Sequence, residues 1–236
     1  MNWNLAYHSV WPLVQGALVA TIPLTILSFV FGLLLAVVVA LGKLSRFRVV
    51  SLVATFYVSV IRGTPLLVQL YIIFYALPYL GVMIDPFPSA VIALSMNVAG
   101  YGAETIRGAI LAVPDGQWEA ATSVGMKRWM TLRHIVLPQA ARIAVPPLSN
   151  TFISLVKDTS LTSVVMVTEM LRRAQQIATP TYEFLTMYSL AAVFYWVICT
   201  GLSALQKRLE TRLSRHDRSA SAAAVRLSGP ARLGFV

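Results

Sequence analysis

Residues 11–41 read WPLVQGALVATIPLTILSFVFGLLLAVVVAL, and this stretch decides the class of fold. No Asp, Glu, Lys or Arg occurs in the chain before Lys43. A hydrocarbon core about 30 Å thick is crossed by roughly 20 apolar residues in an α-helix, so the stretch is long enough for one full span. No basic segment precedes it, and the apolar run is too long for the core of a secretory signal, so we expect the segment to be retained.

The composition of the whole chain agrees with insertion in a membrane. Of 236 residues, 57% are hydrophobic and 12% are charged, and the mean hydropathy is +0.72. Soluble domains carry about 25% charged residues, so a water-soluble globule, a disordered protein and a fibrous repeat are poor fits. The single cysteine, Cys199, excludes a disulfide framework and a Cys-based zinc site. We therefore predict an all-α membrane protein with several spans.

Further apolar segments predict four more transmembrane helices. Together with the first, the predicted spans cover about residues 11–41, 49–80, 89–113, 143–170 and 184–206. The second contains Arg62-Gly63-Thr64-Pro65, and we interpret it as one long span, tilted or kinked at Gly63 and Pro65, where a backbone donor is lost. The alternative for this segment is a re-entrant hairpin. Asp85-Pro86-Phe87-Pro88 predicts a turn before the third span.

The distribution of Lys and Arg predicts the orientation, because basic residues collect in cytoplasmic loops. Fourteen of them fall in the first loop, the polar loop over 114–142 and the tail over 207–236. The opposite side carries two, Arg172 and Arg173, which either snorkel toward lipid headgroups or meet an acidic partner. The prediction is an extracytoplasmic N-terminus over 1–10 and a cytoplasmic C-terminus. The tail is too poor in large apolar residues to fold alone, so we expect it to be disordered. The formal charge of +10 thus indicates topology, and no nucleic-acid partner is expected.

The polar loop between the third and fourth predicted spans has a pattern of its own. Asp115 is a predicted N-cap for a short helix over 117–124. Gly125 suits the left-handed conformation that ends such a helix. A second short helix is predicted over 127–136, and Pro138 predicts the boundary that follows it.

The first of these two helices carries small side chains. We expect Ala120, Ala121 and Ser123 on its surface, where they let the surface of another protein approach closely. Arg128 and Trp129 can anchor that surface. The alternative is an amphipathic loop that merely lies at the membrane interface.

The order and spacing of these motifs resemble one family. Glu119-Ala120-Ala121, then Gly125, then Ile135-Val136-Leu137-Pro138 resemble the EAA motif of binding-protein-dependent ABC importer permeases. Other short sequence motifs resemble those of the polar amino-acid branch of that family, namely 62–69 (RGTPLLVQ), 103–108 (AETIRG), 113–121 (VPDGQWEAA), 137–140 (LPQA) and 152–161 (FISLVKDTSL). The resemblance covers roughly residues 15–206, and the tail after Arg218 matches no sequence motif of the family.

The resemblance implies an ATP-driven importer that moves a polar amino acid by alternating access across the bacterial cytoplasmic (inner) membrane. It implies as partners two cytoplasmic ATPase subunits, a second identical or similar permease subunit and an extracytoplasmic amino-acid-binding protein. ATP and Mg²⁺ would be held by the ATPase subunits, so no cofactor is expected on this chain. The residues that would couple to the ATPase are Glu119, Ala120, Ala121, Gly125 and Arg128.

The chain carries no pattern of its own for ATP hydrolysis. Gly42-Lys43 is followed by Leu44 and lacks the upstream glycine of a phosphate-binding loop. The three histidines lie far apart, and no acid/base pair or metal-ligand spacing occurs, which disfavours an integral-membrane enzyme. The competing function is an autonomous secondary transporter or channel. Because an alternating-access pathway normally lies between two halves, a chain of five helices favours pairing with a second subunit.

Polar residues within the predicted spans are candidates for the translocation pathway, because such residues are costly in lipid. They are Glu104, Lys157, Asp158, Asn97 and Gln69. The alternative for each is a structural role. Glu104 and Arg107 are three apart on a helix and can neutralise each other. Lys157 and Asp158 are adjacent, cannot share a helix face and need other partners, whereas the two amides suit hydrogen bonds between helices.

Overall fold

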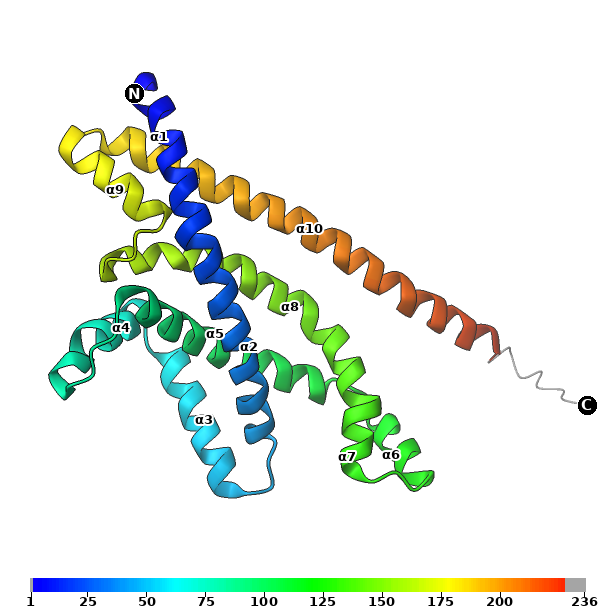
Figure 1. Ribbon diagram of the computed structural model, residues 1–236. Coiled ribbons are helices and arrows are strands. Elements are labelled where there is room, and N and C mark those ends of the chain that lie inside the picture. Colours follow the sequence, from blue (N-terminus) through cyan, green and yellow to red (C-terminus); the bar gives the residue numbers. More distant parts are fainter. Residues whose placement is uncertain (1, 228–236) are drawn as a thin grey trace, which may run out of the picture.

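The computed structural model describes residues 2–227, and every regular element within them is helical (Figure 1). The α-helices are α1 (Trp3–Gly16), α2 (Ile22–Lys43), α3 (Arg48–Gly63), α4 (Leu66–Tyr71), α5 (Pro86–Leu111), α6 (Asp115–Ser123), α7 (Arg128–Thr131), α8 (Leu137–Asp158), α9 (Met170–Thr181) and α10 (Phe184–Leu227). The described part is completed by π-helical η1 (Ala17–Thr21), η2 (Ile72–Ala76) and η4 (Leu132–Val136), and by 3₁₀-helical η3 (Leu77–Leu80) and η5 (Thr159–Val165). The all-α class is confirmed.

The described chain has a π-helical segment two residues before each of three prolines. η1 precedes Pro23, η2 precedes Pro78 and η4 precedes Pro138. Proline lacks an N–H and its ring clashes with the carbonyl group four residues back, and the wider π turn relieves both problems without ending the helix. The prediction that Pro138 forms a helix boundary is therefore wrong. α7, η4 and α8 follow one another without a break from Arg128 to Asp158.

The break predicted in the second apolar block is confirmed. α3 ends at Gly63, and the backbone of Thr64 and Pro65 is extended before α4 begins. The helical segments on the two sides of the break meet at 105°. A bend of this size is a broken span or a re-entrant loop, so it is much sharper than the tilt or kink that we favoured.

The predicted fourth span does not form one helix over 143–170. α8 ends at Asp158, η5 follows it, and Met166 adopts a left-handed conformation with φ of 67°. Hydroxyl groups explain this ending, because Thr159 and Thr162 each donate a hydrogen bond to the carbonyl group three residues back, both over 2.7 Å. Side chains that bond to the local backbone in this way compete with the regular helical pattern.

The helix α10 extends far beyond the predicted span end at residue 206. Its backbone stays helical to Leu227, so the expected disorder of the tail is not seen up to that residue, and the remainder of the tail, 228–236, lies outside the described residues. The segment 207–227 contains neither glycine nor proline. A helix that has already formed adds such residues at little cost, because nucleation is the expensive step.

Two helices of the described chain are long and apolar enough to cross a membrane, and three if the bent pair counts as one span. The first is the continuous helix Trp3–Lys43 formed by α1, η1 and α2, and the second is Phe184–Arg208 of α10. At 1.5 Å per residue the 41-residue first helix is about 60 Å long, roughly twice the thickness of the hydrocarbon core.

Small residues let α2 and α5 pack closely. Along α2, Ser28, Gly32 and Ala36 are buried four residues apart, and Ala99 and Ala103 are buried at the same spacing on α5. A Cβ atom on Gly32 would lie 2.6 Å from Cβ of Val98. Small residues four apart are typical of closely packed helices in membranes, because they let the backbones approach.

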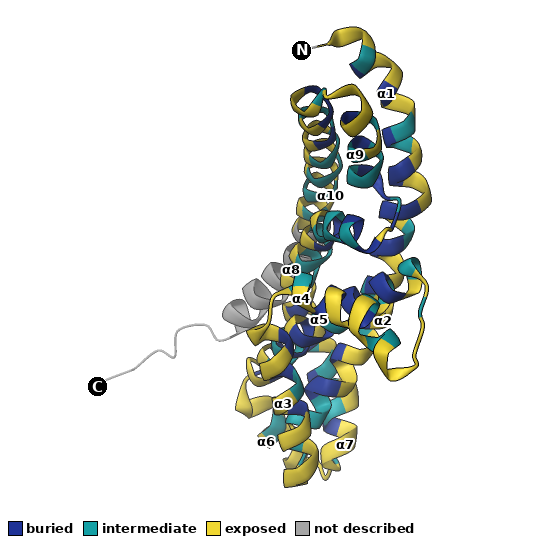
Figure 2. Ribbon diagram, turned by 90° about the vertical axis from the view of Figure 1, so that its left-hand side faces the viewer, coloured by how far each residue is buried: buried dark blue, intermediate teal, exposed yellow. Residues whose placement is uncertain are grey.

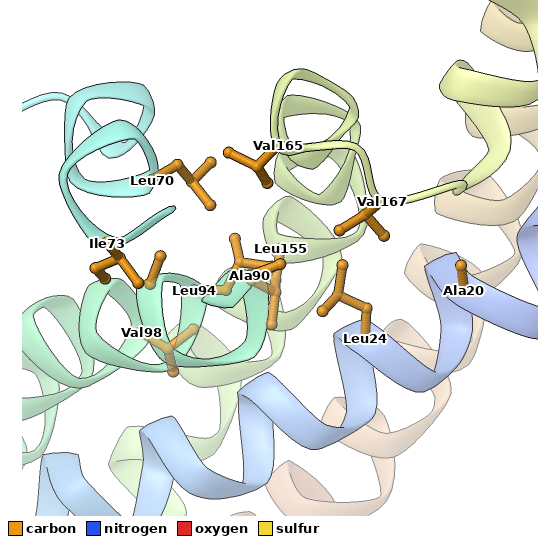
Figure 3. Packing of buried hydrophobic residues seen from close by; sticks show 11 residues of the cluster. Ala20, Leu24, Leu70, Ile73, Ala90, Leu94, Val98, Leu155, Val165 and Val167 are labelled. Carbon is orange, nitrogen blue, oxygen red and sulfur yellow. The ribbon is translucent and has the colours of Figure 1, made fainter. Parts of the chain in front are cut away.

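A hydrophobic core joins this helix pair to the break and to α8. Figure 3 shows Leu24 of α2, Leu70 of α4, Leu94 of α5, Leu155 of α8 and Val165 of η5 gathered around one space. All five side chains are almost fully buried. The core therefore holds α4, the segment after the break, next to α5 and α8.

Several connections of the bundle lie at its two ends. The link between α2 and α3 lies at the same end as α6 and α7, whereas the N-terminus and α9 lie at the other end (Figure 1). At that second end the N–H of Asn2 donates a hydrogen bond to Oγ1 of Thr186 over 3.3 Å. Most residues of the α6–α7 segment are exposed (Figure 2).

Candidate functional site

A cleft of about 700 Å³ opens where the α3–α4 break faces α5 and α8. Its lining mixes polar and apolar side chains from these four helices, the break and η5. The lining residues are Arg62, Gly63, Thr64, Pro65, Leu66, Asn97, Val98, Tyr101, Asn150, Thr151, Ser154, Leu155, Asp158 and Leu161. Two of the candidate pathway residues, Asn97 and Asp158, thus lie in one cleft.

Gln69 supports the break that shapes this cleft. Its Nε2 donates hydrogen bonds to the carbonyl oxygen of Ile61 over 2.9 Å and to Oγ1 of Thr64 over 3.0 Å. The break deprives backbone carbonyl groups of helical partners, and a buried carbonyl group without a partner is costly. Gln69 is itself buried and is not among the cleft-lining residues, so it stabilises the wall from behind.

The cleft contains one basic and one acidic side chain. Arg62, the last basic residue of α3, carries its guanidinium 5.3 Å from the centre of the Tyr101 ring, a distance typical of a cation–π contact. Asp158 lies at the C-terminal end of α8, on another wall. We did not select Arg62 from the sequence, although it is the only charged residue between 49 and 80 and a lone charge in an apolar block is a signal of function.

Glu104 and Lys157 lie outside the lining of the cleft. Glu104 forms ion pairs with Lys43 of α2 and with Arg107, whose Nη2 lies 3.0 Å from Oε2 of Glu104. The expected pairing with Arg107 is confirmed, and the contact with Lys43 ties the end of α2 to α5. In this arrangement Glu104 is thus paired with two basic side chains and does not line the cleft. Lys157, adjacent to Asp158, is not among the residues that line the cleft.

The loop helix α6 begins at Asp115, directly after Pro114. Asp115 is therefore the first helical residue and not the predicted N-cap. Pro114 has a fixed φ and an extended ψ of 138°, so the turn into the helix is made one residue earlier than expected. The acidic side chain in the first turn still favours the helix through its dipole. Gly125 has φ of 77°, which confirms the predicted left-handed conformation after α6.

The residues of the EAA motif do not all face the surface. Glu119, Ala120 and Ser123 are exposed, whereas only 2% of Ala121 is exposed. Successive residues on a helix are about 100° apart, which turns Ala121 toward the bundle when Ala120 faces outward. Ala121 is thus a packing residue in this chain, which corrects the expectation that it lies on the contact surface.

Arg128 begins the helical segment that follows the loop. Its guanidinium lies 5.8 Å from the centre of the Trp118 ring, so it holds the inner side of α6 against α7. From Arg128 the chain continues through η4 and α8 to Asp158 without leaving the helix. One helical segment therefore connects the exposed loop with the acidic wall of the cleft.

Glu169 is a buried acidic residue inside a predicted span that the sequence analysis did not single out. It is completely buried and precedes α9, where its carboxylate accepts hydrogen bonds from the N–H groups of Leu171 and Arg172 over 2.8 and 2.7 Å. The signal was an acidic residue inside the predicted span 143–170. Within residues 2–227, no group of three His, Cys, Asp or Glu side chains is placed to hold a metal ion.

A helical bundle with a polar cleft inside and a short exposed helix at one end has the parts of a membrane transport subunit. The chain belongs to the family of binding-protein-dependent transport system inner membrane components, whose profile matches residues 28–215.

The comparisons with individual proteins agree with this family. The L-cystine transport system permease protein TcyB of Bacillus subtilis (strain 168) is 53% identical over 215 residues, which cover 91% of this chain and 92% of TcyB. The glutamine transport system permease protein GlnP of Escherichia coli (strain K12) is 37% identical over 90% of this chain and 97% of GlnP. Among solved structures, an amino acid ABC transporter with histidines superposes with a TM-score of 0.85 at 36% identity, over 90% of this chain and 99% of that chain.

The family expectation from the EAA motif is confirmed. The chain is the permease subunit of an ABC importer, a component of the inner membrane, and ATP hydrolysis in these systems belongs to a separate subunit. The family also implies an ATPase and a binding protein as partners. An autonomous secondary transporter or channel, the competing function, does not fit this family.

Proposed function

We propose that this permease imports an amino acid through the cleft at the α3–α4 break. The observation that carries the proposal is the presence of Arg62 and Asp158 in one cleft. An amino acid at neutral pH carries a carboxylate and an ammonium group. A guanidinium forms strong, charge-assisted hydrogen bonds with a carboxylate, and Asp158 offers the opposite charge to the ammonium group.

The substrate that we infer within the polar amino acids is L-cystine. A relative named for L-cystine transport shares 53% identity with this chain, against 37% for a relative named for glutamine. A cleft of about 700 Å³ is within the ordinary range for sites that take small molecules. Asn97, Asn150 and Ser154 add neutral hydrogen-bonding groups that suit the two polar ends of cystine.

The proposed topology has five spans, with the N-terminus over 1–10 outside and the C-terminus in the cytoplasm. The spans are α1–α2, the α3–α4 segment, α5, α8 with its continuation toward α9, and α10. Support comes from the basic residues of the α2–α3 link and of the α6–α7 segment, which lie at one end of the bundle. Such clusters mark the cytoplasmic side, and the multi-pass chain would lie in the bacterial cytoplasmic membrane.

The α6–α7 loop is the proposed contact with the ATPase. Glu119, Ala120 and Gly125 present a small, exposed surface there, and Arg128 starts the helix that reaches Asp158. Movement of the loop upon closure of two ATPase subunits would therefore be carried along α8 to one wall of the cleft. A second permease subunit, identical or similar, would supply the other half of the pathway.

The test is ATP hydrolysis by the purified transporter in proteoliposomes, with its binding protein and a panel of L-cystine, L-glutamine, L-arginine and L-histidine. We expect L-cystine to stimulate hydrolysis and labelled L-cystine to accumulate only when ATP is supplied. Stimulation of ATP hydrolysis by a different amino acid, and not by L-cystine, would show that the substrate is that amino acid. Accumulation by the permease chain alone, without ATPase or ATP, would overturn the mechanism.

A further inference from the structure

A second groove, of about 830 Å³, lies behind α6 and is separate from the cleft. It is bounded by the end of α2 and its loop, by the end of α5 and by the inner side of α6 and α7. Trp118 and Thr122 of α6 face this groove, whereas Ala120 and Ser123 of the same helix are absent from its lining. The groove therefore lies on a different side of α6 from Ala120 and Ser123, and it shares Arg128 and Trp129 of α7 with the expected ATPase contact.

The lining of the groove is amphipathic. Leu41, Leu44 and Leu111 form apolar parts of the wall, and Leu111 is 61% exposed in the chain. Arg46 and Arg128 supply two positive charges at the same site, against one negative charge from Asp115. Apolar walls with a net positive rim match a ligand that has hydrocarbon chains and an anionic head.

We propose that this groove binds an anionic phospholipid of the cytoplasmic leaflet. The phosphate would lie between Arg46 and Arg128, and the acyl chains would follow Leu41, Leu44 and Leu111 toward the membrane. Basic pockets between helices on the cytoplasmic side of membrane proteins bind anionic headgroups. Tryptophan side chains such as Trp118 are enriched at the membrane–water interface, at the level of the headgroups.

Other occupants fit this groove less well. The chain after residue 207 is rich in arginine and would be repelled by Arg46 and Arg128. The acyl chains of a zwitterionic lipid would cover the apolar walls of the groove. Its headgroup has no net charge and would leave the excess positive charge of Arg46 and Arg128 without a partner. The inference rests on the proposed cytoplasmic position of the α6–α7 loop, and it adds a lipid that supports the loop helix from its inner side.

The experiment uses the intact permease–ATPase complex in nanodiscs of phosphatidylcholine with a trace of photoreactive lipid. The probe is phosphatidylglycerol with a diazirine in one acyl chain, and phosphatidylcholine with the same diazirine is the comparison. Peptides that contain Leu41–Arg46 and Ile110–Leu111 are then scored for cross-links by mass spectrometry. We expect phosphatidylglycerol to label both peptides at least about five-fold more than phosphatidylcholine, the preference that one or two basic contacts supply.

Variant pairs make the test specific. Arg46→Gln removes one proposed contact and should reduce labelling by phosphatidylglycerol about five-fold. Arg48→Gln makes the same chemical change two residues away, at an exposed position outside the groove lining, and should leave labelling unchanged. Size-exclusion chromatography confirms that both complexes are assembled.

Three outcomes would overturn the proposal. These are equal labelling by the two lipids, an equal loss in the Arg46→Gln and Arg48→Gln complexes, and absence of lipid labelling because protein covers the groove. None of these measurements requires transport. A transporter that fails the amino acid panel can still show the lipid preference, and a transporter without the preference can still import L-cystine, so the two proposals fail separately.

Discussion

The hydroxyl group of Tyr195 donates a hydrogen bond to Oε2 of Glu169 over 2.6 Å and so joins α10 to the start of α9. Glu169 is fully buried, and its carboxylate also holds the first N–H groups of α9. The N–H of Met170 donates a hydrogen bond to Oγ1 of Thr21 in η1 over 3.3 Å. Glu169 thus links α9 to α10, and its neighbour Met170 links α9 to the first helix of the chain.

Tyr195→Phe removes the hydroxyl group and leaves one lone pair of a buried carboxylate without its donor. We expect a loss of about 1–3 kcal/mol in stability, because a buried polar group without its partner carries its full desolvation penalty. Thermal unfolding of the purified complex in detergent measures this loss as a lower midpoint. Tyr188→Phe, on the same helix with 41% of the residue exposed, is the matched control. Equal midpoints for the two variants would show that the Tyr195–Glu169 bond does not stabilise the junction.

Gly32→Ala is expected to separate α2 from α5. The added Cβ would meet Val98 at 2.6 Å, and overpacking of this kind costs about 1–3 kcal/mol. The double variant Gly32→Ala/Val98→Ala restores the space and should recover most of the lost stability. Gly63→Ala is the control, since no atom lies within 4 Å of the Cβ position there. Assembly yield and unfolding temperature report the result, and a double variant no more stable than Gly32→Ala would contradict this packing.

Asp158→Asn keeps the shape of the side chain in the cleft and removes its charge. If Asp158 meets the substrate ammonium group, uptake should fall roughly ten-fold or more, the effect of losing one charge-assisted hydrogen bond. Asp85→Asn makes the same change at an exposed position outside the cleft and should transport normally. Uptake of labelled substrate at equal amounts of assembled complex measures the difference. Normal uptake by the Asp158→Asn transporter would remove Asp158 from the pathway.

Gly125→Val should abolish uptake and weaken binding of the ATPase subunits. Valine is β-branched and tolerates a φ of 77° badly, at a cost of about 1–2 kcal/mol, so the chain would leave α6 in another direction. Gly125→Asn is the informative comparison, because asparagine adopts the left-handed conformation more readily. Co-purification of the ATPase and transport assays are the measurements. Full ATPase binding by the valine variant would show that this turn does not set the contact.

The apolar segments and the short motifs predicted the helical class and the family, because both depend on residues close together in the sequence. The break at Gly63 and Pro65 and the turn at Gly125 followed from local backbone chemistry for the same reason. The presence of Arg62 and Asp158 in one cleft could not be predicted in this way, since it depends on the 105° bend between α3 and α4 and on how α5 and α8 pack against it.

The errors of the sequence analysis have particular physical causes. Pro138 was expected to end a helix, but a π turn accommodates it. Ala121 was expected on the surface, but the side of α6 that packs inward depends on α7 and η4, which contact it, rather than on the motif itself. Glu104 stays a predicted pathway residue, and what the sequence did not show is its ion pair with Lys43, sixty-one residues away.

The π turn at η4 has a consequence for how this segment tolerates changes in length. Its hydrogen bonds run from residue i to i+5, so it holds one more residue than an α turn. Deletion of one residue from Leu132–Val136 would convert the π turn into regular α-helix and would leave Leu137–Asp158 close to its present orientation. Insertion of one residue would instead rotate that segment by about 100° and would take Asp158 out of the cleft lining. We therefore expect this segment to tolerate a deletion of one residue better than an insertion.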